Sequence, residues 1–322
     1  MDGAAAGACT AALEVRSDNY KQYRNMKFEV DAIKSNLRKL LGEKVYRDLT
    51  FYYRNPERAP QDLFREATAS LRVLPDFIIV GAMKSGTTSL FHYLAAHPQV
   101  VAPQHKEIHF FDNQYEKGEN WYRRHFPLRT TMRLKENAIT GESSPYYMLH
   151  PLAPERMKEV VPEAKLIFLL RDPVERAISH YFFMRRFGEE DRSFEEAVRE
   201  SHSSVKKEES KIKKGEKGKS WTHQMYYYIS KVKYHEQIKK YEKKFGKENI
   251  KLLDSKKFLV KTRKVYMDVC NFLRIEKQID VKFERKNKGA NKKEISQKGK
   301  KFAKEKLKMD MENLEKKYKI SS

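Results

Sequence analysis

The segment DFIIVGAMKSGTTSLFHYL, residues 76–94, contains the residues whose types and spacing most clearly point to chemistry. An apolar run leads into a loop bounded by Gly81 and Gly86, and a helix-forming stretch follows. Glycines permit the tight turn, and the amide groups at the start of the helix point at one place, where the helix dipole is positive. We therefore predict that the loop cradles a phosphate group. The expected ligands are Lys84, Ser85, Gly86, Thr87, Thr88 and Ser89.

This loop departs from the GxxxxGK[ST] pattern of the P-loop nucleotidases. Gly81 and Gly86 match the two glycines, but Thr87 stands where the pattern has its lysine. The lysine of the loop is Lys84, three residues earlier, from where it can reach back over a bound anion. The sequence thus argues against an ATP-hydrolysing enzyme, and a P-loop kinase or NTPase stays an alternative hypothesis.

A second segment, LIFLLRDPVERAISHY, brings Arg171 to the end of a predicted strand. The carboxyl ends of parallel strands are where open α/β sheets bind their ligands. Asp172 can cap the helix that follows, and Glu175 would complete a capping box. Ser179 lies two helical turns after Asp172, so both project from the same side of the helix. The guanidinium of Arg171 is suited to hold phosphate oxygens because it donates parallel hydrogen bonds.

A third segment, HKEIHFFD, places Glu107 and His109 two residues apart. In an extended chain two such side chains face the same way. Either group could act as a general base toward an incoming hydroxyl. A lone surface carboxylate or a structural histidine is the more common role for each residue taken singly, so the chemical interpretation depends on the neighbouring motifs.

Around these motifs, short apolar runs alternate with amphipathic helical stretches. The predicted strands are 77–80, 138–142, 166–170 and 250–253, and the predicted helices are 87–96, 173–187, 226–245, 265–273 and 298–319. Alternation of this kind is typical of a parallel sheet covered on both faces. The expected fold class is α/β, a single P-loop-like domain with a central parallel sheet flanked by helices and an N-terminal helical extension.

The domain organisation follows from shifts in composition along the chain. Residues 1–70 are expected to hold a loose tail and a helical segment near residues 18–49, where apolar residues recur at helical spacing. Residues 71–322 are expected to form the α/β domain. Within it, residues 201–220 are low in complexity and predict a mobile basic surface loop.

Composition narrows the classes of protein further. The formal net charge is +23, of which residues 201–322 carry +21, so a polyanionic partner is one interpretation and a solvated face is another. Two cysteines, Cys9 and Cys270, cannot form a disulfide framework, and their spacing does not fit a zinc site. No apolar run approaches the roughly 20 residues that span a bilayer. No secretory leader is evident, so a soluble cytoplasmic protein is the expectation.

Four segments occur in order: GAMKSGTTSL, HKEIHFFD, GESSPYYMLHP and LIFLLRDPVERAISHY. In these segments, and over about residues 75–275, the chain resembles the PAPS-dependent sulfotransferases, in the branch of the heparan-sulfate sulfotransferase domains and their bacterial carbohydrate-type relatives. The resemblance implies an enzyme that moves the sulfuryl group of 3′-phosphoadenosine 5′-phosphosulfate (PAPS) to a hydroxyl or amine of an acceptor, expected to be a carbohydrate. The product would be adenosine 3′,5′-bisphosphate, and no metal would be needed.

The resemblance also implies a role for each motif. The residues from Lys84 to Ser89 would hold the 5′-phosphate, and Arg171 with Ser179 would hold the 3′-phosphate. Lys84 would also stabilise the leaving oxygen. Glu107 would be the general base, with His109 assisting or serving as the base itself.

Further matches are weaker or depart from the family. The stretch SQKGKKF near the carboxyl end resembles a basic loop over the 3′-phosphate, which makes Lys298 and Lys300 candidate contacts. Ser143 stands where heparan-type relatives have a lysine, so Lys84 is expected to be the main cation at the reacting centre. An acidic glycan is one candidate acceptor. A non-catalytic polyanion or nucleic-acid binder is a further alternative, but it leaves the ordered motifs unexplained.

Overall fold

The computed structural model describes residues 58–216, 220–226, 228, 234–277, 280–284 and 295–318, together with Ser35, Lys39 and Leu40. The chain divides into two units, Met1–Phe64 and Arg65–Ser322, and helix α3 (Arg58–Ala67) crosses the division. The helical segment expected at 18–49 lies outside the described residues except at the three single positions. The domain boundary near residue 70 stays a prediction.

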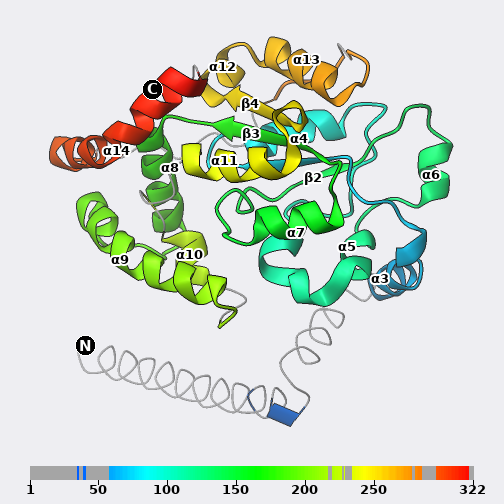
Figure 1. Ribbon diagram of the computed structural model, residues 1–322, viewed down its shortest axis with the longest axis horizontal. Coiled ribbons are helices and arrows are strands. Elements are labelled where there is room, and N and C mark those ends of the chain that lie inside the picture. Colours follow the sequence, from blue (N-terminus) through cyan, green and yellow to red (C-terminus); the bar gives the residue numbers. More distant parts are fainter. Residues whose placement is uncertain are drawn as a thin grey trace, which may run out of the picture. The chain divides into compact units, whose positions relative to one another are not determined.

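The second unit is built on a four-stranded sheet in the order β2-β1-β3-β4, and every neighbouring pair is parallel. The strands are β1 (Phe77–Gly81), β2 (Gly141–Ser143), β3 (Lys165–Leu170) and β4 (Ile250–Asp254). The predicted parallel sheet is confirmed. The strands run in the same direction, so their carboxyl ends and the loops that follow meet at one edge (Figure 1).

The two central strands, β1 and β3, are almost entirely apolar because both faces of the sheet are covered. Ile78 and Val80 of β1 face one cluster of buried side chains, whereas Phe77 and Ile79 face a second cluster. This separation follows from the two-residue period of a strand. The first cluster includes side chains from α7 (Ala153–Val160), α8 (Pro173–Arg186), α11 (Tyr234–Phe245) and α14 (Gln297–Tyr318). The second includes side chains from α4 (Thr87–Ala95), α12 (Ser255–Val260) and α13 (Thr262–Leu273). The central sheet is therefore sandwiched between two helical layers.

Helices lie between these strands, before β1 and after β4. Their bounds are α4 (Thr87–Ala95), α5 (Gly118–Arg123), α6 (Arg129–Arg133), α7 (Ala153–Val160), α8 (Pro173–Arg186), α9 (Phe194–Lys213), α10 (Trp221–Met225), α11 (Tyr234–Phe245), α12 (Ser255–Val260), α13 (Thr262–Leu273) and α14 (Gln297–Tyr318). Short turns are η1 (Ala69–Leu71), η2 (Phe110–Gln114), which is π-helical, η3 (Tyr115–Lys117) and η5 (Lys247–Asn249). None of the described helices is both long and apolar enough to cross a membrane.

The start of α8 confirms one capping prediction and corrects another. Asp172 Oδ1 accepts a hydrogen bond from the backbone amide of Glu175 at 2.7 Å, as expected for a helix cap. Glu175 was expected to complete a capping box by binding back to the start of the helix, but it pairs with Arg171 instead. Its carboxylate lies 3.3 Å from Nη2 of Arg171, because the guanidinium at the end of β3 offers a charged partner.

The loop predicted at 201–220 is wrong over residues 201–213, which continue helix α9. The helix begins at a capping box in which Ser193 and Glu196 satisfy each other's backbone amides. Ion pairs at helical spacing, such as Arg199 with Glu195 and Lys213 with Glu209, support its surface. Ile212 is buried near its end. Low sequence complexity concealed these helix signals.

Candidate active site

The loop between β1 and α4 presents the unpaired amides of a helix start. Gly86 precedes α4 with φ 101°, a left-handed conformation that favours glycine, and it offers no side chain to cap the helix. The first amides of an α-helix have no partner within the helix. Thr87 and Ser89 are buried and Thr88 is half-buried. The loop therefore directs backbone donors and the helix dipole outward, which is an arrangement suited to an anion.

Two elements from distant parts of the sequence hold this loop in place. Arg171, at the end of β3, donates from Nη1 to the carbonyl oxygen of Lys84 at 3.0 Å. Ser255, the first residue of α12, donates from Oγ to the carbonyl oxygen of Ser85 at 2.7 Å. The predicted approach of Lys84 and Arg171 is thus present, and the loop is fixed from the end of β3 and from the start of α12.

The side chain of Lys84 lies against an aromatic ring. Its Nζ is 4.0 Å from the ring centroid of Phe183 on α8, a cation–π contact. No carboxylate lies within ion-pair distance of this ammonium group among the described residues. Burial, followed by the charges of Arg186 and Arg171, lowers the pKa of Lys84 to about 8, against the opposing charge of Glu107.

Glu107 and His109 face each other, but the extended segment predicted for them is wrong. Glu107 has φ 61° and His109 has φ 56°, both in the left-handed region. His109 Nε2 nevertheless lies 3.6 Å from Glu107 Oε2. On the other side of the ring, Nδ1 lies 2.7 Å from Oδ2 of Asp112, which is fully buried. The segment coils because the backbone turns into η2, and this coiling assembles a Glu–His–Asp chain.

The charge states of Glu107 and His109 are set by the groups that contact them. Partial burial acts to raise the pKa of Glu107, but its contacts with His109 and Lys106 outweigh burial and bring the pKa to about 2. Burial acts to lower the pKa of His109, but Asp112 and Glu107 together raise it to about 10. At neutral pH Glu107 is therefore an anion and His109 a cation.

A buried carboxylate beneath the chain was missed by the sequence analysis. Glu142 of β2 accepts hydrogen bonds from the hydroxyls of Tyr122 at 2.5 Å, Ser144 at 2.7 Å and Tyr147 at 3.0 Å. Burial raises the pKa of Glu142, and these hydroxyl donors act in the opposite direction. The partners of Glu142 lie up to 20 residues away in the sequence, so local sequence carried no signal for the pairing beyond the polar ESS run itself.

The same hydroxyls position the segment that contains His109. Ser144 Oγ accepts from the amide of His109 at 3.2 Å, and the hydroxyl of Tyr147 accepts from the amide of Phe110 at 2.8 Å. Tyr146 is also buried, with its hydroxyl 2.6 Å from Nδ1 of His223. Tyr146 and Tyr147 both belong to the buried core. Ser143 Oγ is buried without a hydrogen-bond partner among the described residues.

The remaining candidate residues are Ser179 on α8 and the two lysines Lys298 and Lys300 at the start of α14. Ser179 is half-buried on α8, four residues after Glu175 and hence on the same helix face. Lys298, at the start of α14, is 83% exposed, with Nζ 4.0 Å from Glu195 Oε1. Lys300, in the first turn of α14, is half-buried. The contact of Lys298 and Lys300 with a 3′-phosphate stays a prediction.

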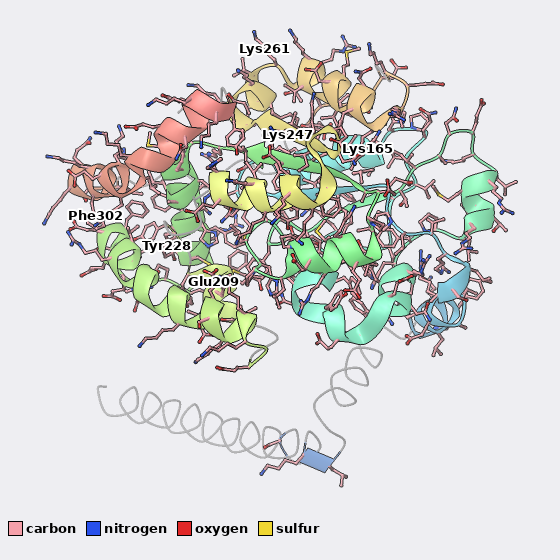
Figure 2. All side chains as sticks on the ribbon, viewed as in Figure 1. Lys165, Glu209, Tyr228, Lys247, Lys261 and Phe302 are labelled. Carbon is pink, nitrogen blue, oxygen red and sulfur yellow. The ribbon has the colours of Figure 1, made fainter. Side chains whose placement is uncertain are left out.

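The start of α14 is held against α9 instead. Phe302 lies over α9 (Figure 2), and the guanidinium carbon of Arg199 is 4.1 Å from the centroid of its ring. Two further polar residues of α8 are buried and bind backbone carbonyl groups of neighbouring segments. Arg176 is buried and donates to the carbonyl oxygen of Tyr228 at 2.6 Å, and His180 Nε2 lies 2.6 Å from the carbonyl oxygen of Met225.

Known proteins resemble part of this chain. It is 40% identical to the membrane-associated sulfotransferase kil1 of Dictyostelium discoideum over 136 residues, which are 40% of this chain and 28% of that protein. It is 44% identical to heparan sulfate glucosamine 3-O-sulfotransferase 3A1 of Mus musculus over 108 residues, which are 34% of this chain and 26% of that protein. The matched stretches therefore span about a quarter of each curated relative's length.

Similarity in three dimensions is more extensive. A sulfotransferase from Alicyclobacillus acidocaldarius superimposes with a TM-score of 0.58 at 28% identity, over 78% of this chain and 98% of that chain. Residues 74–319 match the family described as the sulfotransferase domain. This match includes the loop between β1 and α4, the Glu107–His109–Asp112 group and Arg171. The chain belongs to the sulfotransferase family.

Proposed function

We propose that this protein transfers the sulfuryl group of PAPS in line to a hydroxyl or amine of a carbohydrate acceptor and releases adenosine 3′,5′-bisphosphate. The observation that carries the proposal is the position of Lys84. Arg171 fixes its backbone, and Glu107 lies close enough for its charge to act on the pKa of Lys84. A relative whose name specifies 3-O-sulfation of heparan sulfate supports a carbohydrate acceptor.

The residues of the site fit a doubly phosphorylated donor. The uncapped start of α4 supplies backbone amides for the 5′-phosphate, with the hydroxyls of Thr87, Thr88 and Ser89 beside them. Arg171 supplies a guanidinium for the 3′-phosphate, with Ser179 on the adjoining helix face. Lys298 and Lys300 would add contacts on the open side. PAPS itself supplies the activated sulfuryl group.

The reaction breaks the bond between sulfur and the leaving phosphate oxygen and forms a bond between sulfur and the acceptor. Lys84 stabilises the negative charge that develops on the leaving oxygen. Glu107 takes the proton that the acceptor loses. The protein otherwise contributes position and charge, as in phosphoryl transfer.

The assignment of Glu107 rather than His109 as the base follows from their charges. A group must be unprotonated to accept a proton, and His109 is held as a cation by carboxylates on both sides. His109 is then a positioning residue for Glu107, and Asp112 fixes the orientation of its ring. Glu107 gains basicity when an acceptor displaces Lys106 from it.

Transfer of label from ³⁵S-PAPS across a panel of glycans and small alcohols tests the proposal. We expect label in a carbohydrate product, and a loss on the order of 10²–10³ in turnover for Lys84→Ala with the fold retained. A kinase or NTPase would instead be stabilised against heat by Mg-ATP and not by adenosine 3′,5′-bisphosphate. Near-normal sulfuryl transfer by Lys84→Ala would contradict the assigned role.

A further inference from the structure

One corner of the α/β domain exposes apolar side chains at the end of a firmly held helix. Val260, the last residue of α12, is 76% exposed, and Leu259 beside it is 44% exposed. The other side of α12 is packed, since Phe258 is buried and Ser255 donates from Oγ to the carbonyl oxygen of Ser85. The exposure of Leu259 and Val260 is therefore imposed by a helix that is anchored to the rest of the domain.

Cationic side chains surround these two apolar residues. Five of them are exposed on α12, on α13 or at the junction of the two helices: Lys256, Lys257, Lys261, Arg263 and Lys264. Figure 1 shows α12 and α13 together on the outer side of the sheet, and in Figure 2 Lys261 lies at the outer edge of that layer. We refer to these five cations together with Leu259 and Val260 as the α12 corner.

The charge of the α12 corner is offset only slightly by its own segment. Residues 255–264 contain the five cations and neither Asp nor Glu. Asp254, directly before them, is buried, and its carboxylate caps α12 by accepting from the backbone amides of Lys256 and Lys257. Its second oxygen lies 3.9 Å from Nζ of Lys257, so this carboxylate offsets one of the five charges at most. The corner therefore presents a positive field around an apolar centre.

The combination of apolar and cationic groups narrows the kind of partner. The phosphates of a nucleic acid would pair with the cations but would leave Leu259 and Val260 in water. An apolar groove on another protein would cover Leu259 and Val260 but would remove the cations from water without pairing them. The surface of an anionic bilayer meets both requirements, because its charged headgroups lie directly above the acyl chains.

We propose that the α12 corner binds the surface of a bilayer that contains anionic phospholipids. Leu259 and Val260 enter the boundary between headgroups and acyl chains, and the five cations lie among the anionic headgroups. The contact is peripheral and sensitive to salt, because the charges that carry it stay close to solvent. None of these residues has a role in the proposed sulfuryl transfer, so the inference is independent of that function.

Sedimentation of the full chain with two kinds of vesicle tests the contribution of charge. One kind contains phosphatidylcholine alone, and the other contains phosphatidylcholine with phosphatidylserine. The charge variant is Lys261→Gln with Lys264→Gln. Its matched control is Arg133→Gln with Lys135→Gln, at exposed cations in and beside α6, which lies away from α12 and α13 (Figure 1). Thermal unfolding of each variant is measured, and we expect it to be unchanged because all four side chains are exposed.

The unmodified chain should bind the vesicles with phosphatidylserine at least about 10-fold more tightly than those without it. The charge variant should lose roughly 10-fold to 100-fold in affinity for the anionic vesicles, and its control less than about threefold. Equal binding to the two kinds of vesicle, or equal losses in the charge variant and its control, would overturn the proposal.

A second measurement tests whether the apolar centre enters the lipid. Val260→Ser should weaken binding to the anionic vesicles about threefold to tenfold, whereas Leu134→Ser, at a residue that is 88% exposed, should not. In Val260→Trp, lipid brominated on its acyl chains should quench the new fluorescence beyond the quenching seen for the two native tryptophans, and Leu134→Trp should show no such excess.

A polyanion-binding surface gives the opposite pattern in these variants. Unquenched fluorescence of Val260→Trp at saturating vesicles would overturn the proposal. So would unchanged vesicle binding by Val260→Ser together with binding of a random-sequence DNA duplex that shows the same dependence on Lys261 and Lys264. That result would assign the α12 corner to polyanions and not to lipid.

Discussion

Arg171 donates a hydrogen bond from its guanidinium to the backbone carbonyl oxygen of Lys84, 87 positions earlier in the chain. The bond joins the loop after β1 to the end of β3, two strands that are neighbours in the sheet. The hydrogen bond uses only the backbone carbonyl group of Lys84, so the ammonium group of the same residue can lie over the ring of Phe183. Two cations are thereby held at one edge of the sheet, where an anion can bind both.

The alkaline limit of activity should report Lys84. Its pKa is lowered to about 8, so its charge is lost as the pH rises through that value, and kcat/KM for the donor should fall. Bound phosphates favour the charged form, so the decline in kcat should lie at higher pH. Lys84→Arg keeps its charge throughout this range and should remove the decline in kcat/KM. A decline of the same midpoint in Lys84→Arg would assign it to another group.

The acid limit should depend on Lys106. This residue pairs with Glu107 and contributes to the low pKa of that carboxylate, so Lys106→Ala should raise it. The acid limb of the pH profile of kcat/KM should then move to higher pH, whereas the exposed control Lys135→Ala should leave it in place. Turnover at neutral pH should be retained in Lys106→Ala. A loss of 10²-fold there would give Lys106 a direct role in transfer.

The free energy of unfolding should depend on pH through the protonation of His109. Its pKa is raised from 6.5 to about 10, so the folded state binds this proton more tightly than the unfolded state. The resulting stabilisation is complete below about pH 6.5 and is lost as the pH rises toward 10. The difference in unfolding free energy between the unmodified protein and His109→Gln, measured by urea titration, should shrink over that window. A constant difference would show that His109 is not held as a cation.

Removing the hydroxyl of Tyr147 should lower the free energy of unfolding by more than the small loss of side-chain volume would. Tyr147→Phe leaves the amide of Phe110 without its acceptor and removes a donor from buried Glu142. We expect a loss of about 1–3 kcal/mol in the free energy of unfolding, together with slower turnover because the segment that carries His109 is loosened. Tyr115→Phe, which removes a hydroxyl bonded to exposed Glu159, is the control and should cost less than about 1 kcal/mol. Equal costs would show that the Glu142 network does not position the site.

The parts of the fold that local patterns determine were predictable. Apolar runs that end at Gly81 and at Arg171 marked the two central strands, and Asp172 marked the start of α8. Each signal lies within a few residues of the feature it predicts. Helix α9 was missed because its Lys- and Glu-rich surface has few apolar residues, although Ser193 and Glu196 marked its start.

The parts of the site that long-range packing determines were not predictable. Glu142 depends on hydroxyls from Tyr122 and Tyr147, and the coil at Glu107 and His109 depends on bonds to residues 143 and 144. A two-residue spacing suggested that these side chains would meet, but for the wrong reason, since left-handed backbone and not an extended strand brings them together.

The most direct test of the account compares the binding of adenosine 3′,5′-bisphosphate and adenosine 5′-phosphate by calorimetry. We predict that the protein binds the first roughly 10-fold to 100-fold more tightly, because Arg171 recognises the 3′-phosphate. Arg171→Gln should remove most of that preference, and Arg133→Gln should preserve it. Equal affinity for the two nucleotides, or an undiminished preference in Arg171→Gln, would contradict the central claim that this edge of the sheet holds a 3′-phosphorylated sulfuryl donor.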